Sequence, residues 1–305
     1  MKIGCVVLHY RFWPGVRATL DALLTQTRPP DMVVVVDNHS NDGSLPELRR
    51  AYPDLEVIEA ESNRAYAAGM NLGMETVLTR GVDAILLLTD ECRLSPDALG
   101  TLVARLEAAP GLGAVGPVLG YLSQPEKVFS AGGRVELRGW DTRHLREPEL
   151  VSEWTGRPPH AVEWLDGAAL LLRSQAVRAI GRLDEGYIKY FEETDYMFRL
   201  RAAGWSVECV PQAVAWQEPS GKPPYLWTHS RLRFLARRAP TRVLLGEIAR
   251  MARSLLRNRL RPRPQSVRAE DRERRRALLH FVTSPLNRLT TLDGHIRDEL
   301  ERRNV

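Results

Sequence analysis

Three clusters of carboxylates follow short apolar runs in this sequence. In the first, Asp37 comes directly after the run 32–36, and asparagine, serine and glycine residues continue to Ser44. A carboxylate at the end of a strand can accept hydrogen bonds from a nucleobase imide or a ribose hydroxyl, and ligands of parallel sheets bind at such ends. The same small polar residues are typical of any tight turn, so this cluster alone leaves both interpretations open.

The second cluster is the adjacent pair Asp90 and Glu91, which follows the apolar run 84–88. Two neighbouring carboxylates repel each other unless a positive charge lies beside them. A Mg²⁺ or Mn²⁺ ion that is shared with substrate phosphates is the usual solution, and an exposed acidic turn is the alternative. The pair therefore predicts a cation site.

The third cluster, Glu192, Glu193 and Asp195, opens a predicted helix. The helix dipole favours carboxylates in a first turn, so they need no catalytic role to be there. However, the preceding loop, residues 184–191, is rich in aromatic side chains. A carboxylate among aromatic rings has the environment of a general base, and we favour this interpretation.

Other common catalytic signatures are missing. No Gly-x-Gly-x-x-Gly segment follows the first apolar run and no Walker-type loop is present, which argues against dinucleotide and P-loop sites. There is no nucleophile elbow and no Ser-His-Asp order. A nucleotidyltransferase would need a basic phosphate-binding loop after the first run, where Arg11 is the one clearly basic residue.

The elements that must position these clusters are alternating strands and helices. Five apolar runs predict parallel strands covered on both faces, at 3–8, 32–36, 55–59, 84–88 and 113–118. Residues 44–47 have the sequence of a capping box, and Ser95 followed by Pro96 predicts a second helix start. The alternation indicates a doubly wound sheet, with the clusters at its ligand-binding edge.

Beyond residue 120 the pattern changes. Residues 120–160 predict short antiparallel strands and a loop. A second core segment follows, with one strand and two helices at 168–173, 174–180 and 192–203. The remainder is helical and basic, with a break at 261–264. We expect a catalytic domain over residues 1–222 and a basic helical extension over residues 223–305.

Composition limits the class of protein and its partners. With 44% hydrophobic and 27% charged residues, the chain is an ordinary globular one. Most of the net charge of +5 lies beyond residue 230, which favours an anionic partner or a solvated helical face. Three cysteines at unrelated positions indicate buried thiols in a reducing compartment. No apolar stretch approaches the ~20 residues that span a bilayer, and no signal peptide is evident. We expect a cytoplasmic protein, at most peripheral to a membrane.

In order along the chain, these segments resemble glycosyltransferase family 2, most closely its bacterial rhamnosyltransferase-like members. Residues 35–44 match the family's Val-Asp-Asn-x-Ser-x-Asp-Gly-Ser, and residues 63–73 are similar to its Asn-x-Gly-Phe-Ala-x-Gly-x-Asn-x-Gly. Residues 88–99 fall on its Asp-x-Asp-like stretch. The last two matches, to the Gly-Ala segment and to Phe-Asp-Glu with Glu-Asp-x-Asp, are 164–173 and 183–200.

The resemblance implies a GT-A fold, which is a Rossmann-like α/β domain with a mixed central sheet, here followed by a C-terminal helical tail. It implies inverting transfer of a sugar from a nucleotide-diphosphate donor, with Glu193 as the base and Glu192 and Asp195 beside it. The implied nucleotide-binding residues are Leu8, His9, Asp37, Asn63, Tyr66, Asn71 and Asp90. The implied ligands of a Mg²⁺ or Mn²⁺ ion are Asp90, Glu91 and Gln217. The acceptor would lie against Trp164, Asp166, Gly167, Ala168 and Tyr190.

Four positions depart from the family's pattern. Arg11 replaces an asparagine, Glu91 and Glu193 are each one methylene longer than the family's aspartate, and Gln217 stands for a late histidine. Glutamine still offers a carbonyl oxygen, but it is a weaker ligand. These departures leave a catalytically inactive nucleotide-sugar or glycan binding module as the main alternative, ahead of a nucleotidyltransferase.

The substrates stay open at this level. The rhamnosyltransferase likeness favours a dTDP-deoxysugar donor. A natural-product aglycone, a cell-surface glycan and a lipid-linked glycan are all acceptable acceptors, and no nucleic acid partner is expected. Residues 243–256 are roughly amphipathic, as a helix at a membrane surface would be.

Overall fold

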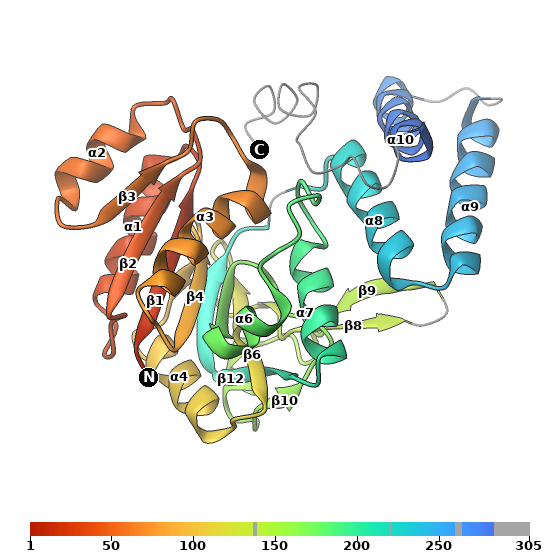
Figure 1. Ribbon diagram of the computed structural model, residues 1–305. Coiled ribbons are helices and arrows are strands. Elements are labelled where there is room, and N and C mark those ends of the chain that lie inside the picture. The colour runs from red at the N-terminus through yellow and green to blue at the C-terminus, as the bar shows by residue number, and fades with distance from the viewer. Residues whose placement is uncertain (137–138, 220, 260–263, 284–305) are drawn as a thin grey trace.

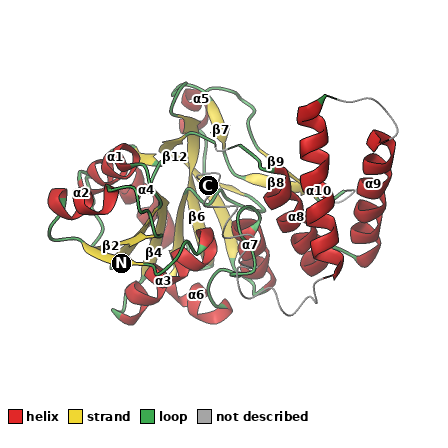
Figure 2. Ribbon diagram, turned by 90° about the horizontal axis from the view of Figure 1, so that it is seen from above, coloured by secondary structure: helices red, strands yellow, loops and turns green. Residues whose placement is uncertain are grey.

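The computed structural model describes residues 1–136, 139–219, 221–259 and 264–283. A mixed sheet crosses the larger part of the molecule with helices on both faces, and three further helices stand together at one side (Figures 1 and 2). This is the predicted α/β architecture with a helical C-terminal part.

The central sheet combines parallel and antiparallel strands. Its order is β10-β12-β6-β11-β4-β1-β2-β3. The main strands are β1 (Ile3–His9), β2 (Met32–Asp37), β3 (Glu56–Glu59), β4 (Ala84–Thr89), β6 (Leu112–Tyr121), β11 (Ala169–Arg173) and β12 (Ser206–Gln217). The first four are mutually parallel, and β11 runs antiparallel between β4 and β6. Shorter strands are β5 (Arg93–Leu94), β7 (Val128–Ser130) and β10 (His160–Ala161), and β8 (Gly133–Glu136) and β9 (Asp141–His144) form a separate hairpin.

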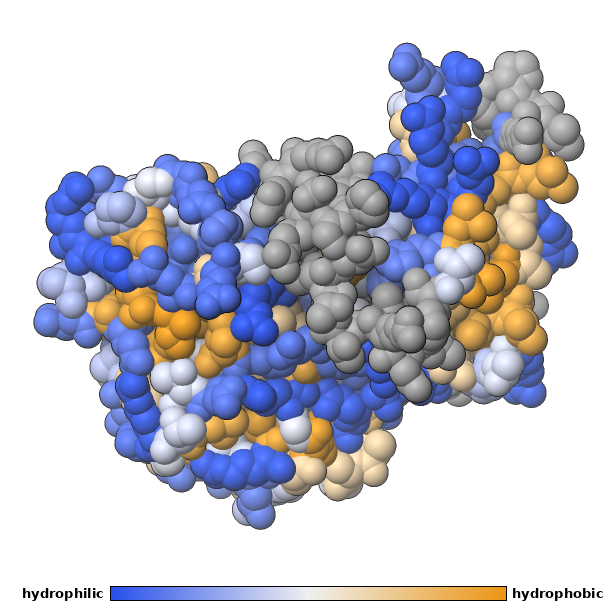
Figure 3. All heavy atoms as spheres, turned by 45° about the horizontal axis from the view of Figure 1, so that its top comes forward, coloured by the Kyte–Doolittle hydropathy of each residue, from blue (hydrophilic) through white to orange (hydrophobic). Residues whose placement is uncertain are grey.

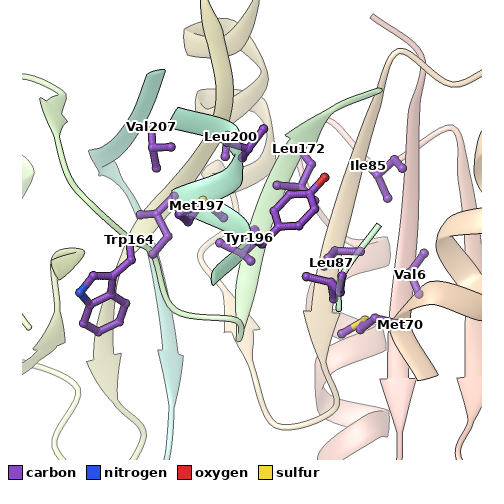
Figure 4. Packing of buried hydrophobic residues seen from close by; sticks show 14 of the residues in the cluster. Val6, Met70, Ile85, Leu87, Trp164, Leu172, Tyr196, Met197, Leu200 and Val207 are labelled. Atoms are coloured by element: carbon purple, nitrogen blue, oxygen red, sulfur yellow. The ribbon is translucent and has the colours of Figure 1, made fainter. Parts of the chain in front are cut away.

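Two hydrophobic layers cover the sheet. One face carries α3 (Ala65–Thr79), α6 (Ser174–Ile180) and α7 (Glu192–Ala202), and the other carries α1 (Trp13–Leu24), α2 (Ser44–Ala51) and α4 (Ala98–Ala108); α5 (Val151–Thr155) lies beyond β12. Strand residues alternate between the layers: Val6 and Leu8 pack with Met70 of α3, whereas Cys5 and Val7 pack with α1. Figure 4 shows the first layer. The side chain of Leu8, expected at the nucleotide site, is therefore part of the core.

The structure corrects two predicted helix starts. Helix α2 begins at Ser44, but Gly43 occupies the cap position with φ 84°, and no side chain caps the helix. The hydroxyl of Ser44 contacts Asp42 instead of the helix turn. Helix α4 begins at Ala98, preceded by Asp97 rather than by Ser95. In both places the local pattern located the turn but not the first helical residue.

Strand β12 is an element that the sequence analysis did not single out. It pairs in parallel with β6, and the register shifts between Val210 and Val214. This irregularity interrupts the alternation of buried residues that would have marked a strand. Its last residue, Gln217, lies beside Tyr121 at the end of β6.

The C-terminal helices are α8 (Pro224–Arg238), α9 (Thr241–Arg259) and α10 (Gln265–Thr283). Helix α8 packs on α7, with Phe234 stacked against Phe191 at 5.3 Å between ring centroids. The hydroxyl of Tyr225 lies 2.5 Å from the ring of His280 and ties α10 to α8. The predicted break at 261–264 lies outside the described residues, except for its last proline.

Two expectations from composition can be compared with the structure. All three cysteines are free and buried. Among the described residues, none of the helices has both the length and the apolar character that crossing a bilayer requires.

Candidate active site

The ends of β1, β2 and β4 bring the first two acidic clusters together. His9 is fully buried, and its Nδ1 lies 2.9 Å from Asp90 Oδ2 while its Nε2 lies 2.8 Å from Ser44 Oγ. The same Asp90 oxygen accepts the backbone N–H of Tyr10 at 2.8 Å, and Asp37 Oδ1 is 4.0 Å from His9 Nε2. His9 thus joins the two acidic loops. Because it is buried, we assign it a positioning role rather than contact with a ligand.

The turn after β2 is held by its own polar side chains. Asp37, only 3% exposed, accepts hydrogen bonds from the hydroxyl and the backbone N–H of Ser40. Asn38 donates to Asn63 Oδ1 at 3.0 Å, and this oxygen also accepts the N–H of Ala65 at 2.9 Å. These bonds join the turn after β2 to the start of α3. Asp37 and Asn63 therefore lie together at one sheet edge, as expected, and their hydrogen bonds stabilise the loops there.

The two remaining nucleotide-site candidates on α3 point to different places. Tyr66 donates a hydrogen bond to the carbonyl of Gly167 at 2.6 Å and lines the central pocket. Asn71 is buried and hydrogen-bonded to the loop that precedes α7. Its amide N–H donates to the carbonyl of Leu183 and to Glu185 Oε1, both at 2.9 Å. Its amide oxygen accepts the N–H of Leu183 at 3.1 Å. Asn71 does not line the pocket, so the structure gives it a structural position.

Two members of the third acidic cluster, Glu192 and Glu193, line a pocket of about 370 Å³. The pocket-lining residues that the sequence analysis had singled out are Tyr66, Trp164, Asp166, Gly167, Ala168, Tyr190, Glu192, Glu193 and Gln217. All five acceptor candidates are among them. Trp164 is only 3% exposed and packs edge-on against His144, with 4.8 Å between the ring centroids. It is therefore chiefly a core residue that borders the pocket. Asp166 lies 3.5 Å from the His144 ring.

The backbone turns sharply just before the two glutamates at the start of α7. Tyr190 and Phe191 both have left-handed φ angles, 72° and 67°, which reverse the chain just before the helix. Burial, together with the charge of Glu192, raises the pKa of Glu193 well above its ordinary value. Burial also raises the pKa of Glu192 to about 7, although Lys189 opposes the shift. Glu192 Oε2 is buried with no hydrogen-bond partner among the described residues.

Asp195, the third acid, does not face the pocket. It is fully buried and accepts hydrogen bonds from Arg238 Nε at 2.6 Å, Arg199 Nε at 3.2 Å and the hydroxyl of Tyr187 at 3.2 Å. Arg199 belongs to α7, Arg238 to α8, and Tyr187 to the loop between α6 and α7. Asp195 therefore fixes α7 against α8, and its contribution to the site is to position Glu192 and Glu193.

Of the proposed metal ligands, Asp90 and Glu91 are adjacent, and Gln217 lies on another strand. Asp90 uses one oxygen for internal contacts, Glu91 is exposed beside it, and Gln217 lines the pocket at the end of β12. No three His, Cys, Asp or Glu side chains of the described residues converge as metal ligands. Two adjacent carboxylates do fit a Mg²⁺-like ion that takes its remaining ligands from substrate phosphates. Glu91 is exposed overall, but partial burial of its carboxyl and the neighbouring charge of Asp90 raise its pKa.

The sequence analysis missed several other pocket residues, among them two lysines and a tryptophan that could contact a ligand. Lys189, Lys222 and Trp227 line the pocket together with the glutamates. Trp227 comes from the segment assigned to the helical extension, Lys222 is the last residue of the predicted catalytic domain, and a single lysine in a loop carries no motif. The aromatic loop 184–191 was the available signal for Lys189.

A mixed sheet with buried carboxylates and a pocket beyond its strand ends, followed by C-terminal helices, defines the GT-A class of glycosyltransferases. The sequence profile described as "Glycosyltransferase like family 2" matches residues 3–238, which is most of the chain. The protein therefore belongs to this family, and it is a nucleotide-sugar-dependent glycosyltransferase. The match ends with helix α8.

Individual proteins support this assignment. The N-acetylglucosaminyl-diphospho-decaprenol L-rhamnosyltransferase of Mycobacterium tuberculosis is 27% identical over 230 residues, which cover 68% of this chain and 73% of that protein. The structure of GalNAc-T7 with UDP, GalNAc and Mn²⁺ matches with a TM-score of 0.61 at 13% identity, covering 77% of this chain and about half, 48%, of the other. The mannosyltransferase PcManGT of Pyrobaculum calidifontis, with GDP-Man and Mn²⁺, matches with a TM-score of 0.53 at 17% identity and 98% and 85% coverage. The two structures share the fold, and both of those proteins hold Mn²⁺.

Proposed function

We propose that the protein is an inverting glycosyltransferase that moves a sugar from a nucleoside-diphosphate donor to a hydroxyl of its acceptor. The observation that carries the proposal is the pair Glu192 and Glu193 in one pocket, with raised pKa values and a carboxylate oxygen that has no partner among the described residues. A binding module would gain nothing from the cost of burying two adjacent acids. An enzyme that needs a base near neutral pH would.

The donor would lie across the ends of β1, β2 and β4. Asp37 and Asn63 would bound the site for the base and ribose, and the diphosphate would lie over Asp90 and Glu91. A Mg²⁺ or Mn²⁺ ion bound there by these two carboxylates, with Gln217 Oε1 nearby, would neutralise charge on the leaving diphosphate. By likeness to the rhamnosyltransferase relative, we propose a dTDP-deoxysugar as the donor.

Glu193 would remove the proton of the acceptor hydroxyl. The acceptor oxygen then bonds to the anomeric carbon as the bond from that carbon to the donor phosphate breaks, and the electron pair leaves with the nucleoside diphosphate. A single displacement inverts the anomeric centre. Glu192 Oε2, buried and without a partner among the described residues, would accept a second hydrogen bond from the acceptor.

The acceptor would extend toward the C-terminal helices, which we propose as an accessory part of the enzyme, with residues 1–222 as its catalytic part. A second pocket of about 500 Å³ lies between α8, α9 and α10 and shares Lys222 and Trp227 with the catalytic pocket. The ring of Trp227 contacts Phe191, directly before Glu192, at 5.9 Å. Trp227 thus lies at the border of the two pockets, and an acceptor larger than one sugar would occupy both.

We further propose a lipid-linked acceptor at a membrane surface on the cytoplasmic side. Leu245 and Leu256 lie on the same side of α9 and are 59% and 60% exposed. Arg242 and Arg253 flank this stripe and are exposed. Apolar surface gathers at the side of the molecule that carries the outer helices (Figure 3). An apolar stripe bordered by arginines suits the interface of an anionic bilayer, whereas a small soluble aglycone would not need it.

Thermal denaturation in the presence of dTDP, UDP or GDP, with and without Mn²⁺, tests the donor site directly. Stabilisation by one nucleotide supports the proposal and identifies the base. Release of free sugar or its transfer from the matching donor then separates an enzyme from an inactive binding module. If no nucleotide stabilises the protein under any condition, the proposed donor site is wrong.

A further inference from the structure

Lys189 is a cation in the middle of the acidic site. It lines the same pocket as Glu192 and Glu193. Its ammonium interacts electrostatically with the carboxylates of Glu192, Glu91 and Asp90. These three come from two separate clusters of the sequence, at the end of β4 and at the start of α7. Lys189 therefore lies where the proposed diphosphate and the proposed acceptor site meet.

The surrounding structure holds the lysine in this place. Its backbone carbonyl accepts a hydrogen bond from the hydroxyl of Ser230 on α8 at 2.8 Å. The next two residues, Tyr190 and Phe191, adopt left-handed φ angles, which restrict the loop. The ammonium lies 5.7 Å from the centroid of the Tyr190 ring, a favourable distance for a cation over an aromatic face. Helix α8 thus holds the backbone of Lys189, and the neighbouring Tyr190 ring lies beside its ammonium.

The ammonium is nevertheless available to a ligand. Among the described residues no carboxylate lies within 4.0 Å of Lys189 Nζ, although three carboxylates act on it from further away. Burial lowers the pKa of Lys189, and the three acids oppose this shift. A partly desolvated ammonium with three donors and no carboxylate within 4.0 Å among the described residues is well suited to bind phosphate oxygens.

The metal ligands are weak at this site. Gln217 contributes a neutral amide, and Asp90 already accepts two contacts on one oxygen. A protein-borne cation beside them supplies positive charge that a divalent ion would otherwise have to supply alone.

We propose that Lys189 is a donor-binding residue whose ammonium contacts the diphosphate, so that the protein binds its nucleoside diphosphate without a divalent cation. This inference rests on the proposed function, because it assumes that the donor lies over Asp90 and Glu91. It adds to that function that a side chain of the protein, rather than a metal ion alone, supplies the positive charge that binds the leaving diphosphate.

Calorimetric titration with UDP, dTDP and GDP, each in EDTA and in Mn²⁺, tests the inference without relying on turnover. The wild-type protein should keep measurable binding of its nucleotide in EDTA. Lys189→Gln should weaken that binding about 10-fold to 100-fold in EDTA, the range expected for a lost hydrogen bond to a charged group. Mn²⁺ should restore most of the loss. Lys189→Arg keeps the charge and should retain binding in EDTA, and Lys127→Gln, at an exposed lysine far along the chain, should behave as wild type.

A second variant tests the local charge by itself. Lys189→Glu removes the cation and adds a carboxylate beside Asp90 and Glu91, so it should bind free Mn²⁺ more tightly than the wild type does. Electron paramagnetic resonance of Mn²⁺ without nucleotide measures this directly. Equal Mn²⁺ binding by both proteins would show that Lys189 does not lie against these carboxylates.

The outcomes separate the two proposals. If wild type binds a nucleotide with Mn²⁺ but not in EDTA, or if Lys189→Gln binds as wild type in EDTA, the role of Lys189 is refuted and the donor site stands. If no nucleotide binds under any condition, the donor site itself is wrong. Melting curves of each variant show whether lost binding reflects lost folding.

Discussion

Replacing Glu193 by glutamine removes the proposed base while keeping the size of the side chain. General bases contribute roughly 10²-fold to 10⁴-fold to rates, so we expect transfer to fall by about that factor. Glu193 lines the pocket, whose lining includes neither Asp37 nor Asp90, and nucleotide affinity should therefore not change. Initial-rate measurements with the matching donor give the first quantity, and calorimetry gives the second.

The pH dependence gives a second readout of the same substitution. Because burial raises the pKa of Glu193, the wild-type base is protonated at low pH, and transfer should rise with pH through that raised pKa. The residual activity of Glu193→Gln should lack this limb.

Stability should respond to pH in the opposite direction. A carboxyl whose pKa is higher in the folded state than in the unfolded state binds more protons when folded, so its contribution to stability is lost as pH rises. Glu193→Gln should therefore be more stable than wild type at pH 8, with the difference vanishing near pH 4.5, the ordinary pKa of a glutamate. Denaturant titrations at both pH values measure it.

Two controls make this test decisive. Glu192→Gln, at the neighbouring position, should lower transfer less, because Glu192 is proposed only to bind the acceptor. Asp195→Asn should instead destabilise the fold, since Asp195 is fully buried between Arg199 and Arg238. Unchanged turnover in Glu193→Gln would refute the assignment of the base, and a loss of nucleotide binding would place Glu193 in the donor site.

Three further predictions follow from packing and exposure. Trp227→Ala should raise the KM for the acceptor about tenfold or more, as loss of an aromatic anchor does, and leave the nucleotide Kd unchanged; an equal effect on both would place Trp227 elsewhere. Gly186→Ala sets a Cβ against the buried Arg233 guanidinium and should lower the free energy of unfolding by about 1–3 kcal/mol, while Gly246→Ala, in open space, is the control. Leu245→Glu combined with Leu256→Glu should abolish sedimentation with anionic vesicles, which Leu24→Glu should leave intact; binding that survives the double change would argue against the membrane proposal.

The sequence by itself determined the sheet edge and the acids that lie on it. The apolar runs that form β1, β2 and β4 were predicted within one residue of each end, because buried parallel strands leave an uninterrupted apolar pattern. Parallel strands share one carboxyl edge, and this brings Asp37 and Asp90 together without any knowledge of packing. Glu192 and Glu193 were also recognisable, since they open a helix after an aromatic loop.

Only the tertiary structure decided which polar residues face the pocket. Asn71 and Asp195 belong to the same motifs as the site residues, yet their partners, Leu183 and Arg238, are 112 and 43 positions away. Lys189 shows the converse case, because it belongs to no motif and lies beside acids from two distant segments. The reason is physical: strand and helix periodicity is a local property of the chain, whereas the partner of a buried charge is chosen by the packing of whole elements.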